Sequence, residues 1–316
     1  MHIQLIKSRA MEIVKKNERK VMKPLLDWAF KYLFATEESK PNLIGFLNIL
    51  LNPEAPIVDV QFMNNESLPA AQNLKGCLFD IICKDANEDR FLIEVQTTQT
   101  VNIVDRIIYY TCRLMDRMGK SGSQWDYKDI KRVYSICLMN FTFEQDPKLR
   151  KDIQLYDIEE HKAFSDKLNI ILLQLPCLKA ESIDECNANY EFLLYLLREM
   201  QNGMKTTEQL KNEVAQTNLP QATKELFYKV LDTADVASLS EMDRIRYESD
   251  LKNYMDTMSC IEFATVKGEE KGRAEGREEG KAEEKNSIAK SLKAKGIDLT
   301  TIAECTGLAT QEIEKL

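Results

Sequence analysis

The chain has 316 residues, 44% of them hydrophobic, with a formal net charge of −8 and a pI near 5.2. This length and apolar content allow one large folded domain or two ordinary ones. The acidic balance argues against a protein that grips polyanions over its whole surface, so any contact with nucleic acid must be made by a local basic patch.

The eight cysteines lie in or beside apolar runs, without a CxxC pair or a nearby histidine cluster. This pattern is typical of reduced, buried thiols. No segment reaches the ~18 to 20 apolar residues needed to cross a bilayer, and the charged N-terminus lacks the apolar stretch of a signal peptide. We therefore expect a cytoplasmic protein with no membrane partner.

Helical and strand patterns follow one another along the first half of the chain. Helical periodicity runs from about Lys7 to Phe34, where Pro24 opens a new helix, and another helix follows Pro41. Residues 100–119 have helical spacing and end at Gly119. Five apolar runs predict strands, at 57–63, 77–83, 91–96, 133–141 and 169–175. The order predicts a mixed α/β sheet flanked by helices, whose fourth strand runs parallel to the third or to a neighbour.

The second half of the chain is predicted to be helical. Glycines 268, 272, 276 and 280 recur every fourth residue in a charged repeat, where each costs a helix about 1 kcal/mol but the Glu, Lys and Arg residues permit i,i+4 pairs. The last residues, IAECTGLATQEIEKL, are similar to a helix-turn-helix. Their second helix is not strongly basic, which favours packing or oligomerisation over reading DNA.

These patterns predict five regions. We expect an N-terminal helix at 1–21, an α/β domain at 22–180, a helical region at 181–263, a charged Gly-repeat helix or linker at 264–285, and a small helix-turn-helix-like unit at 286–316.

Two carboxylates carry the clearest functional signal. A hairpin with its turn centred on Asn87 places Asp80 opposite Glu94, with Cβ atoms about 4.5 to 5.5 Å apart. Like charges at that distance destabilise a sheet unless a cation lies between them. Strand alternation directs Gln96 to the same face as Glu94, and the apolar neighbours of Asp80 predict a covered strand in which an unpaired carboxylate is costly. We therefore expect a divalent cation here.

Other chemistries have little support. His2 and His161 are the only histidines, so a Ser-His-Asp triad, a Cys-His pair or a histidine zinc site is poorly supported. We expect His161 to be an exposed loop residue. No glycine-rich phosphate loop followed by Lys and Ser or Thr appears after a strand.

An acid on one strand, a short turn and an acid-x-polar motif on the next strand resemble the PD-(D/E)XK nuclease core. The wider pattern resembles the Rpn family of recombination-promoting nucleases, bacterial PD-(D/E)XK transposase-like proteins, over about residues 22–180. It consists of DWAFKYLF at 27–34, FLNILL at 46–51, the hairpin, and RIIYYTCRLMDRMG at 106–119. The resemblance implies a restriction-endonuclease-like α/β fold. It also implies a Mg²⁺-dependent DNA endonuclease, with Mn²⁺ as a substitute, associated with recombination or mobile elements.

The resemblance assigns roles to individual positions. Asp80 matches the metal-binding aspartate and Glu94 the second acid, with the Val95 carbonyl as a further metal ligand. Gln96 stands where the motif usually has lysine; a glutamine can orient water but brings no positive charge. Asp27 matches an acid in the family's DFAFK-like segment, and it either contacts the metal or caps its helix.

A basic, aromatic stripe is predicted on the helix after the hairpin, made of Arg106, Tyr110, Arg113 and Arg117. It either tracks DNA phosphates or is a solvated face paired with neighbouring acids. The alternative function is a catalytically weak or inactive nuclease fold that acts in DNA binding or in homo-oligomer assembly through the C-terminal helices. Gln96 favours that alternative.

Overall fold

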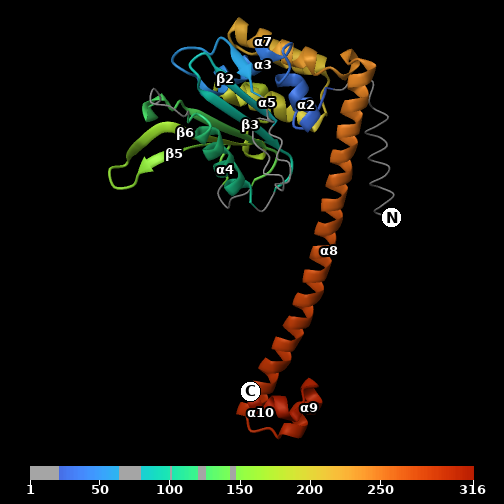
Figure 1. Cartoon of the computed structure of the whole chain (residues 1–316). Coiled ribbons are helices and arrows are strands. Elements are labelled where there is room, and N and C mark those ends of the chain that lie inside the picture. Colours follow the sequence, from blue (N-terminus) through green and yellow to red (C-terminus); the bar gives the residue numbers. More distant parts are fainter. Residues whose placement is uncertain (1–20, 64–79, 100–101, 120–125, 143–146) are drawn as a thin grey trace. The chain divides into compact units, whose positions relative to one another are not determined.

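The computed structural model describes residues 21–63, 80–99, 102–119, 126–142 and 147–316. The chain divides into two compact units, Met1–Leu251 and Lys252–Leu316. The first unit holds a sheet with its helices, and the second holds most of a long helix and the C-terminal helices (Figure 1). The predicted N-terminal helix at 1–21 lies almost entirely outside the described residues.

Six strands among the described residues form one mixed sheet in the order β1-β2-β3-β4-β6-β5. β2 is antiparallel to β3, β3 is parallel to β4, and β4 is parallel to β6. The predicted mixed α/β fold and its parallel fourth strand are therefore confirmed. The strands are β1 Val60–Phe62, β2 Ile81–Asp85, β3 Arg90–Gln96, β4 Val133–Met139, β5 Arg150–Asp157 and β6 Lys162–Gln174.

The β2–β3 hairpin has the predicted register, with Ile81 opposite Ile93. Asp85 holds its turn, because Oδ1 accepts hydrogen bonds from the backbone N–H of Asn87 (2.9 Å) and of Asp89 (3.0 Å). One expectation is wrong: β2 begins at Ile81, so Asp80 lies just before the strand and not within it.

Helix α4 (Ile103–Asp116) covers one face of the sheet. It buries Ile103, Ile107, Thr111 and Leu114, which recur at helical spacing on one side of the helix. Ile107 packs in one cluster with residues of β4 and β6, and Thr111 Oγ1 hydrogen bonds to Ser135 Oγ of β4 at 2.6 Å. This packing fixes α4 over the hairpin and over the parallel strands.

Helices α2 (Asp27–Phe34), α3 (Lys40–Leu51), α5 (Asn189–Asn202), α6 (Thr207–Gln216) and α7 (Gln221–Thr233) gather on the side of the sheet away from α4 (Figure 1). α3 contacts α2, α5 and α7. The rings of Phe30, Phe34 and Phe46 pack in series, with centroids 5.0 and 5.6 Å apart. Short 3-10 turns lie at Tyr127–Asp129, Leu175–Cys177, Ile183–Glu185 and Val236–Ser238.

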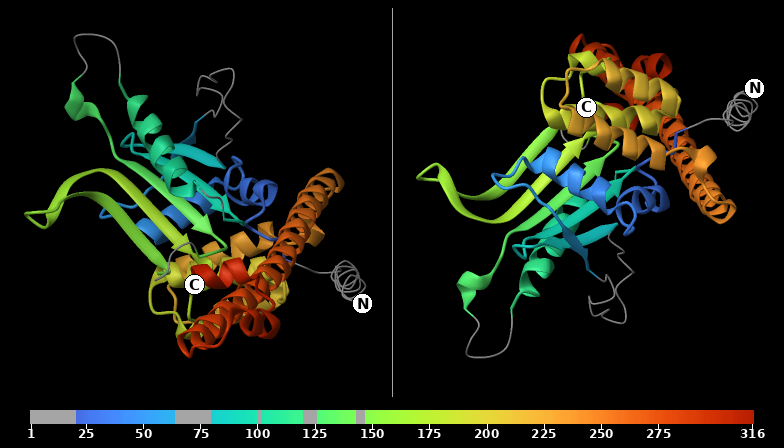
Figure 2. Two further views of the ribbon diagram at one scale, coloured as in Figure 1. Left: turned by 90° about the horizontal axis from the view of Figure 1, so that it is seen from below. Right: turned by 90° about the horizontal axis from the view of Figure 1, so that it is seen from above.

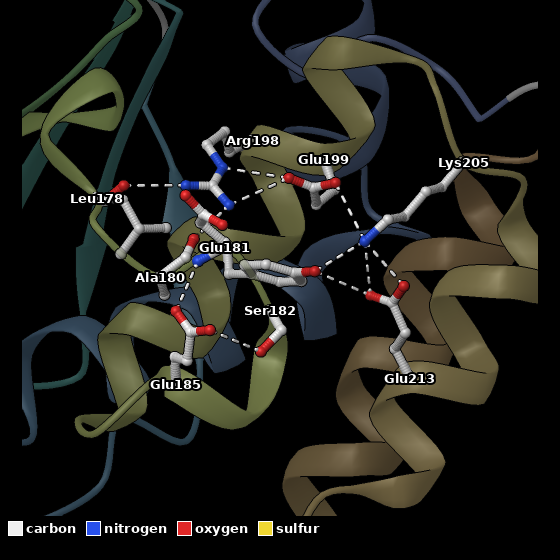
Figure 3. Close-up of polar contacts among 10 residues, drawn as sticks. Leu178, Ala180, Glu181, Ser182, Glu185, Arg198, Glu199, Lys205 and Glu213 are labelled. Carbon is white, nitrogen blue, oxygen red and sulfur yellow. Dashed lines mark hydrogen bonds and ion pairs between the residues drawn. The ribbon is translucent and has the colours of Figure 1, made fainter.

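A polar network ties α5 to α6 and to the segment after β6 (Figure 3). Arg198 of α5 donates hydrogen bonds to the carbonyls of Leu178 (3.0 Å) and Ala180 (2.6 Å). Lys205 Nζ donates to Tyr195 Oη at 2.8 Å and pairs with Glu213 at 2.8 Å. Glu199 pairs with both Arg198 and Lys205 at 3.2 Å, so Glu199 and Glu213 are matched by these two cations and the partly buried network is satisfied by the protein's own groups.

Helix α8 (Glu241–Ala294) runs for 54 residues. The charged repeat is helical as predicted, and its four glycines face open space. In the second unit α9 (Leu299–Thr306) and α10 (Thr310–Lys315) close a small core on Ala289, Ile302 and Ile313.

Strand β5 and the first half of β6 were not expected. They form a hairpin that extends beyond the rest of the sheet (Figure 2), where Tyr156 and Phe164 are exposed. Its apolar side chains do not alternate regularly with polar ones, so no strand was predicted there. His161 is exposed at its tip, as predicted.

Two further predictions concern the cysteines and membranes. Cys83, Cys137 and Cys186 are buried as predicted and Cys177 is partly buried, but Cys112, Cys260 and Cys305 are exposed, so the burial prediction is wrong for these three. Cys77 lies outside the described residues. Among the described residues, each helix is either too short or too polar for a membrane span.

Candidate active site

The carboxyl groups of Asp27 and Asp80 meet beside β3. Asp27 is the first residue of α2, and its side chain hydrogen bonds to that of Asp80, which precedes β2. Asp80 Oδ2 also accepts a hydrogen bond from the backbone N–H of Val95 at 2.6 Å. Asp27 Oδ1 pairs with Lys31 Nζ at 2.6 Å. The two acids are thus held by groups from α2 and from β3.

This acid pair shares one proton near neutral pH. Burial, together with the hydrogen bond and the charge of Asp27, raises the pKa of Asp80 to about 8, although the Val95 N–H opposes the shift. Burial also raises the pKa of Asp27, but hydrogen bonds from Asp80 and Lys31 outweigh it and the net pKa is lowered. Asp80 therefore keeps the proton and donates a hydrogen bond to the Asp27 carboxylate.

A second cluster joins Glu94, Gln96 and Arg106. Gln96 Nε2 donates a hydrogen bond to Glu94 Oε1 at 2.7 Å, and Arg106 Nη2 of α4 donates to the same oxygen. Glu94 is 8% exposed. Burial raises its pKa, while the charge of Arg106 and the two hydrogen bonds oppose the shift. Glu94 and Gln96 share one face of β3, as strand alternation predicted.

The two acids of the hairpin have separate partners. The paired register ends at Ile81 opposite Ile93, and Asp80, just before β2, directs its carboxyl to Asp27 and to the N–H of Val95. The charges of both acids nevertheless reach Cys137 of β4. Burial is the main cause of its raised pKa, and the charges of Glu94 and Asp80 raise it further. In the described parts of the chain, no group of three or more His, Cys, Asp or Glu side chains is arranged to hold a metal ion.

Asp250 of α8 caps helix α2. Its Oδ2 accepts a hydrogen bond from the backbone N–H of Trp28 at 2.9 Å, whereas the N-cap residue Leu26 supplies no side-chain cap. Nearby, Tyr247 Oη accepts from the N–H of Lys23 at 3.1 Å. The interpretation of Asp27 as the cap of its own helix is therefore wrong. No local signal pointed to Asp250, because it lies 222 residues from Trp28.

The four residues of the predicted basic stripe on α4 lie in different surroundings. Arg106 joins the Glu94 cluster, and Tyr110 packs against the core. Arg113 lies over the ring of Tyr109, with 5.7 Å between the guanidinium carbon and the ring centroid. Burial and the neighbouring charge of Arg113 lower the pKa of Arg117. The outer part of the stripe is therefore a small basic patch formed by Arg113 and Arg117.

Comparison with known families places these residues in context. The family model described as "PD-(D/E)XK nuclease family transposase" matches residues 24–264, which is well over half of the chain. The chain belongs to this family. No curated protein and no solved structure matches it. As a PD-(D/E)XK nuclease family transposase it has the expected restriction-endonuclease-like α/β fold and is of nuclease type, and nucleases of this kind typically use divalent metals. The match includes both acid clusters and Asp250.

Proposed function

We propose that this PD-(D/E)XK nuclease family transposase is a DNA endonuclease that depends on Mg²⁺, with Mn²⁺ as a substitute, and that it acts in recombination or on mobile elements. The acid pair of Asp27 and Asp80, whose carboxyl groups hydrogen bond to each other next to β3, the strand that carries Glu94, is the observation that carries this proposal. Two carboxyl groups that share a proton bring charge into a partly buried place where a cation is favoured. A divalent ion can take the place of that proton.

The donor atoms suit Mg²⁺, which prefers oxygen ligands. We assign the Asp80 and Glu94 carboxylates as ligands, together with the Val95 carbonyl, and Asp27 as an accessory acid. An extended residue directs its N–H and C=O towards the same neighbour, and the Val95 N–H faces Asp80. The Val95 carbonyl therefore lies on the same edge of β3. When bound, the ion would lower the pKa of a water molecule and polarise a phosphoryl oxygen.

The protein's own groups orient this site. Gln96 Nε2 holds Glu94 at 2.7 Å, and its amide oxygen is an acceptor of the kind that orients an attacking water. Lys31 Nζ holds the Asp27 carboxylate at 2.6 Å. These contacts fix both acids, which keeps their oxygens in place as the substrate binds. Gln96 is therefore assigned a catalytic, orienting role.

The basic patch of Arg113 and Arg117 is assigned to DNA phosphates. Both side chains are partly exposed on α4, the helix that also carries Arg106 into the site, and Arg113 rests over the ring of Tyr109. Each Arg–phosphate contact contributes about −0.9 to the slope of log affinity against log salt concentration, so removing two contacts makes that slope less steep by about 2. The double substitution Arg113→Gln with Arg117→Gln is expected to show that reduction in oligonucleotide binding.

Cleavage of plasmid DNA tests the endonuclease proposal. Purified full-length protein should nick or cut plasmid with Mg²⁺ or Mn²⁺ and not with EDTA, and Asp80→Ala and Glu94→Ala should abolish the activity. Asp105→Ala, which removes an exposed acid of α4, is the matched control. Intact plasmid across metals, salts and pH values, or full activity in Asp80→Ala, would refute the proposal.

A second function, self-assembly without catalysis, is favoured by one feature of the second unit. There α8 exposes Met258 and Ile261, large apolar side chains three residues apart on one face of a long helix. A helix from another copy of the chain would bury them. Light scattering should then give a multiple of the 36.5 kDa chain mass, and Met258→Glu with Ile261→Glu should reduce it to one chain. Assembly without cleavage would favour this function over the first.

A further inference from the structure

We propose that Arg106 is a catalytic residue that contacts the phosphate undergoing cleavage, and that it supplies the positive charge that Gln96 cannot. The inference rests on the proposed endonuclease function and deepens it. The sequence predicts Arg106 on a basic stripe of α4 that either tracks phosphates or is solvated, and in the structure its guanidinium lies in the Glu94 cluster.

The position of Arg106 follows from the packing of α4. Ile103 and Ile107 on either side of it are buried against the sheet, so the base of the side chain is fixed. Its Nη2 donates to Glu94 Oε1, the same oxygen that accepts from Gln96 Nε2 at 2.7 Å. Arg106 and Gln96 thus converge on one atom. The charge that is absent from position 96 in the sequence is present beside it in space.

Arg106 also keeps a donor for a ligand. Its Nε is buried and has no hydrogen-bond partner in the described part of the chain. Buried polar atoms are nearly always paired, so this one calls for an explanation. A guanidinium has five N–H donors in a planar fork that matches two oxygens of a phosphate. A turn of the guanidinium towards bound DNA would bring Nε to a phosphate oxygen and satisfy it.

The contact between Arg106 and the phosphate would stabilise the transition state of hydrolysis. A water oxygen forms a bond to phosphorus while the bond from phosphorus to the leaving sugar oxygen breaks. One water proton ends on the leaving oxygen and the other is released to solvent, so the products are a sugar hydroxyl and a phosphate monoester. Negative charge grows on the phosphoryl oxygens as the bonds exchange, and a fixed donor there stabilises the transition state. Arginine stays protonated throughout and transfers no proton.

A charge-relocation experiment tests the inference. Steady-state kinetics on plasmid DNA are measured for Arg106→Gln, Arg106→Lys and the double variant Arg106→Gln with Gln96→Lys. We expect Arg106→Gln to lower kcat roughly 100- to 1000-fold, as the loss of one transition-state donor does, with a smaller change in KM. The double variant should recover at least about tenfold of that loss. Lys128→Gln, which removes a cation from an exposed position, should match the parent.

The outcomes separate catalysis from structure. Arg106→Gln should bind Mn²⁺ in calorimetry at least as tightly as the parent, because Glu94 loses a competing cation; a collapsed site would bind it more weakly. Unchanged kcat in Arg106→Gln, or no recovery in the double variant, overturns the inference. If Arg106→Gln fails to fold, the same comparison is made in the Arg106→Lys background.

If the parent protein does not cut DNA, the two proposals are tested separately. That result would refute the endonuclease proposal, and the Arg106 contact would then be judged by oligonucleotide affinity in Ca²⁺. Weaker binding in Arg106→Gln with recovery in the double variant supports the contact. Equal affinity in all variants overturns it.

Discussion

Replacing Asp80 by asparagine should make the metal-free protein more stable at alkaline pH. Protonated Asp80 donates a hydrogen bond to Asp27 and accepts one from Val95. The amide of Asp80→Asn can make both contacts without carrying a proton that is lost as the pH rises. The substitution therefore keeps the geometry and removes the titration.

The size of the effect follows from the raised pKa. The ordinary aspartate value is 3.8 and the value in the folded protein is about 8, so the stability linked to Asp80 is complete below 3.8 and is lost as the pH rises through about 8. Between these values the folded chain holds a proton that the unfolded chain has released. The free energy of unfolding then falls by about 1.4 kcal/mol per pH unit, or roughly 4 kcal/mol from pH 5 to pH 8 at most.

Urea unfolding at pH 5 and pH 8 in EDTA measures this difference. The parent should lose stability relative to Asp80→Asn over that range, and a saturating divalent ion should restore the parent at pH 8 by about 2.7 kcal/mol at a hundredfold excess over Kd. Asp80→Asn should not respond to the ion. Asp105→Asn, at an exposed position, should follow the parent. Parallel pH profiles for the parent and Asp80→Asn would refute the shared-proton interpretation.

Three further substitutions test the packing. Asp250→Ala should lower the free energy of unfolding by about 1 kcal/mol in urea, as the loss of a helix cap does, while Glu248→Ala on an exposed position of α8 should leave it unchanged. Gly45→Ala places a Cβ against the Leu226 side chain and should cost about 1 to 3 kcal/mol in thermal melts, a cost that Leu226→Ala relieves in the double variant. Lys205→Met leaves Glu213 of the network in Figure 3 without its cation, while Glu199 keeps Arg198, and should lower stability by about 1 to 2 kcal/mol, with no change in DNA cleavage.

The hairpin and the helix over it were predictable because their signals are local. Alternation in β3 placed Glu94 and Gln96 on one face, and the turn from Asp85 to Asp89 set the register of β2. The apolar spacing in α4 identified its buried side. Each of these features depends on residues close together in the chain.

The remaining contacts of the site join distant segments, and no spacing encodes them. Asp27 meets Asp80 because α2 and the start of β2 converge in the fold. Asp250 reaches Trp28 across 222 residues. Arg106 was placed on the correct helix, but the length of its side chain lets it leave the outer stripe and reach Glu94. Such pairings need the three-dimensional arrangement of the elements.

The bond between Asp250 and Trp28 has a consequence for synthesis. At about 5 to 20 residues per second, a ribosome needs roughly 10 to 45 s to add the 222 residues that separate them. Throughout that interval the Trp28 N–H in the first turn of α2 lacks the Asp250 carboxylate that accepts its hydrogen bond. The start of the helix, which carries Asp27, is then not yet capped. The stabilisation of about 1 kcal/mol that Asp250 gives to the start of α2 is therefore added only after most of the polypeptide has been made.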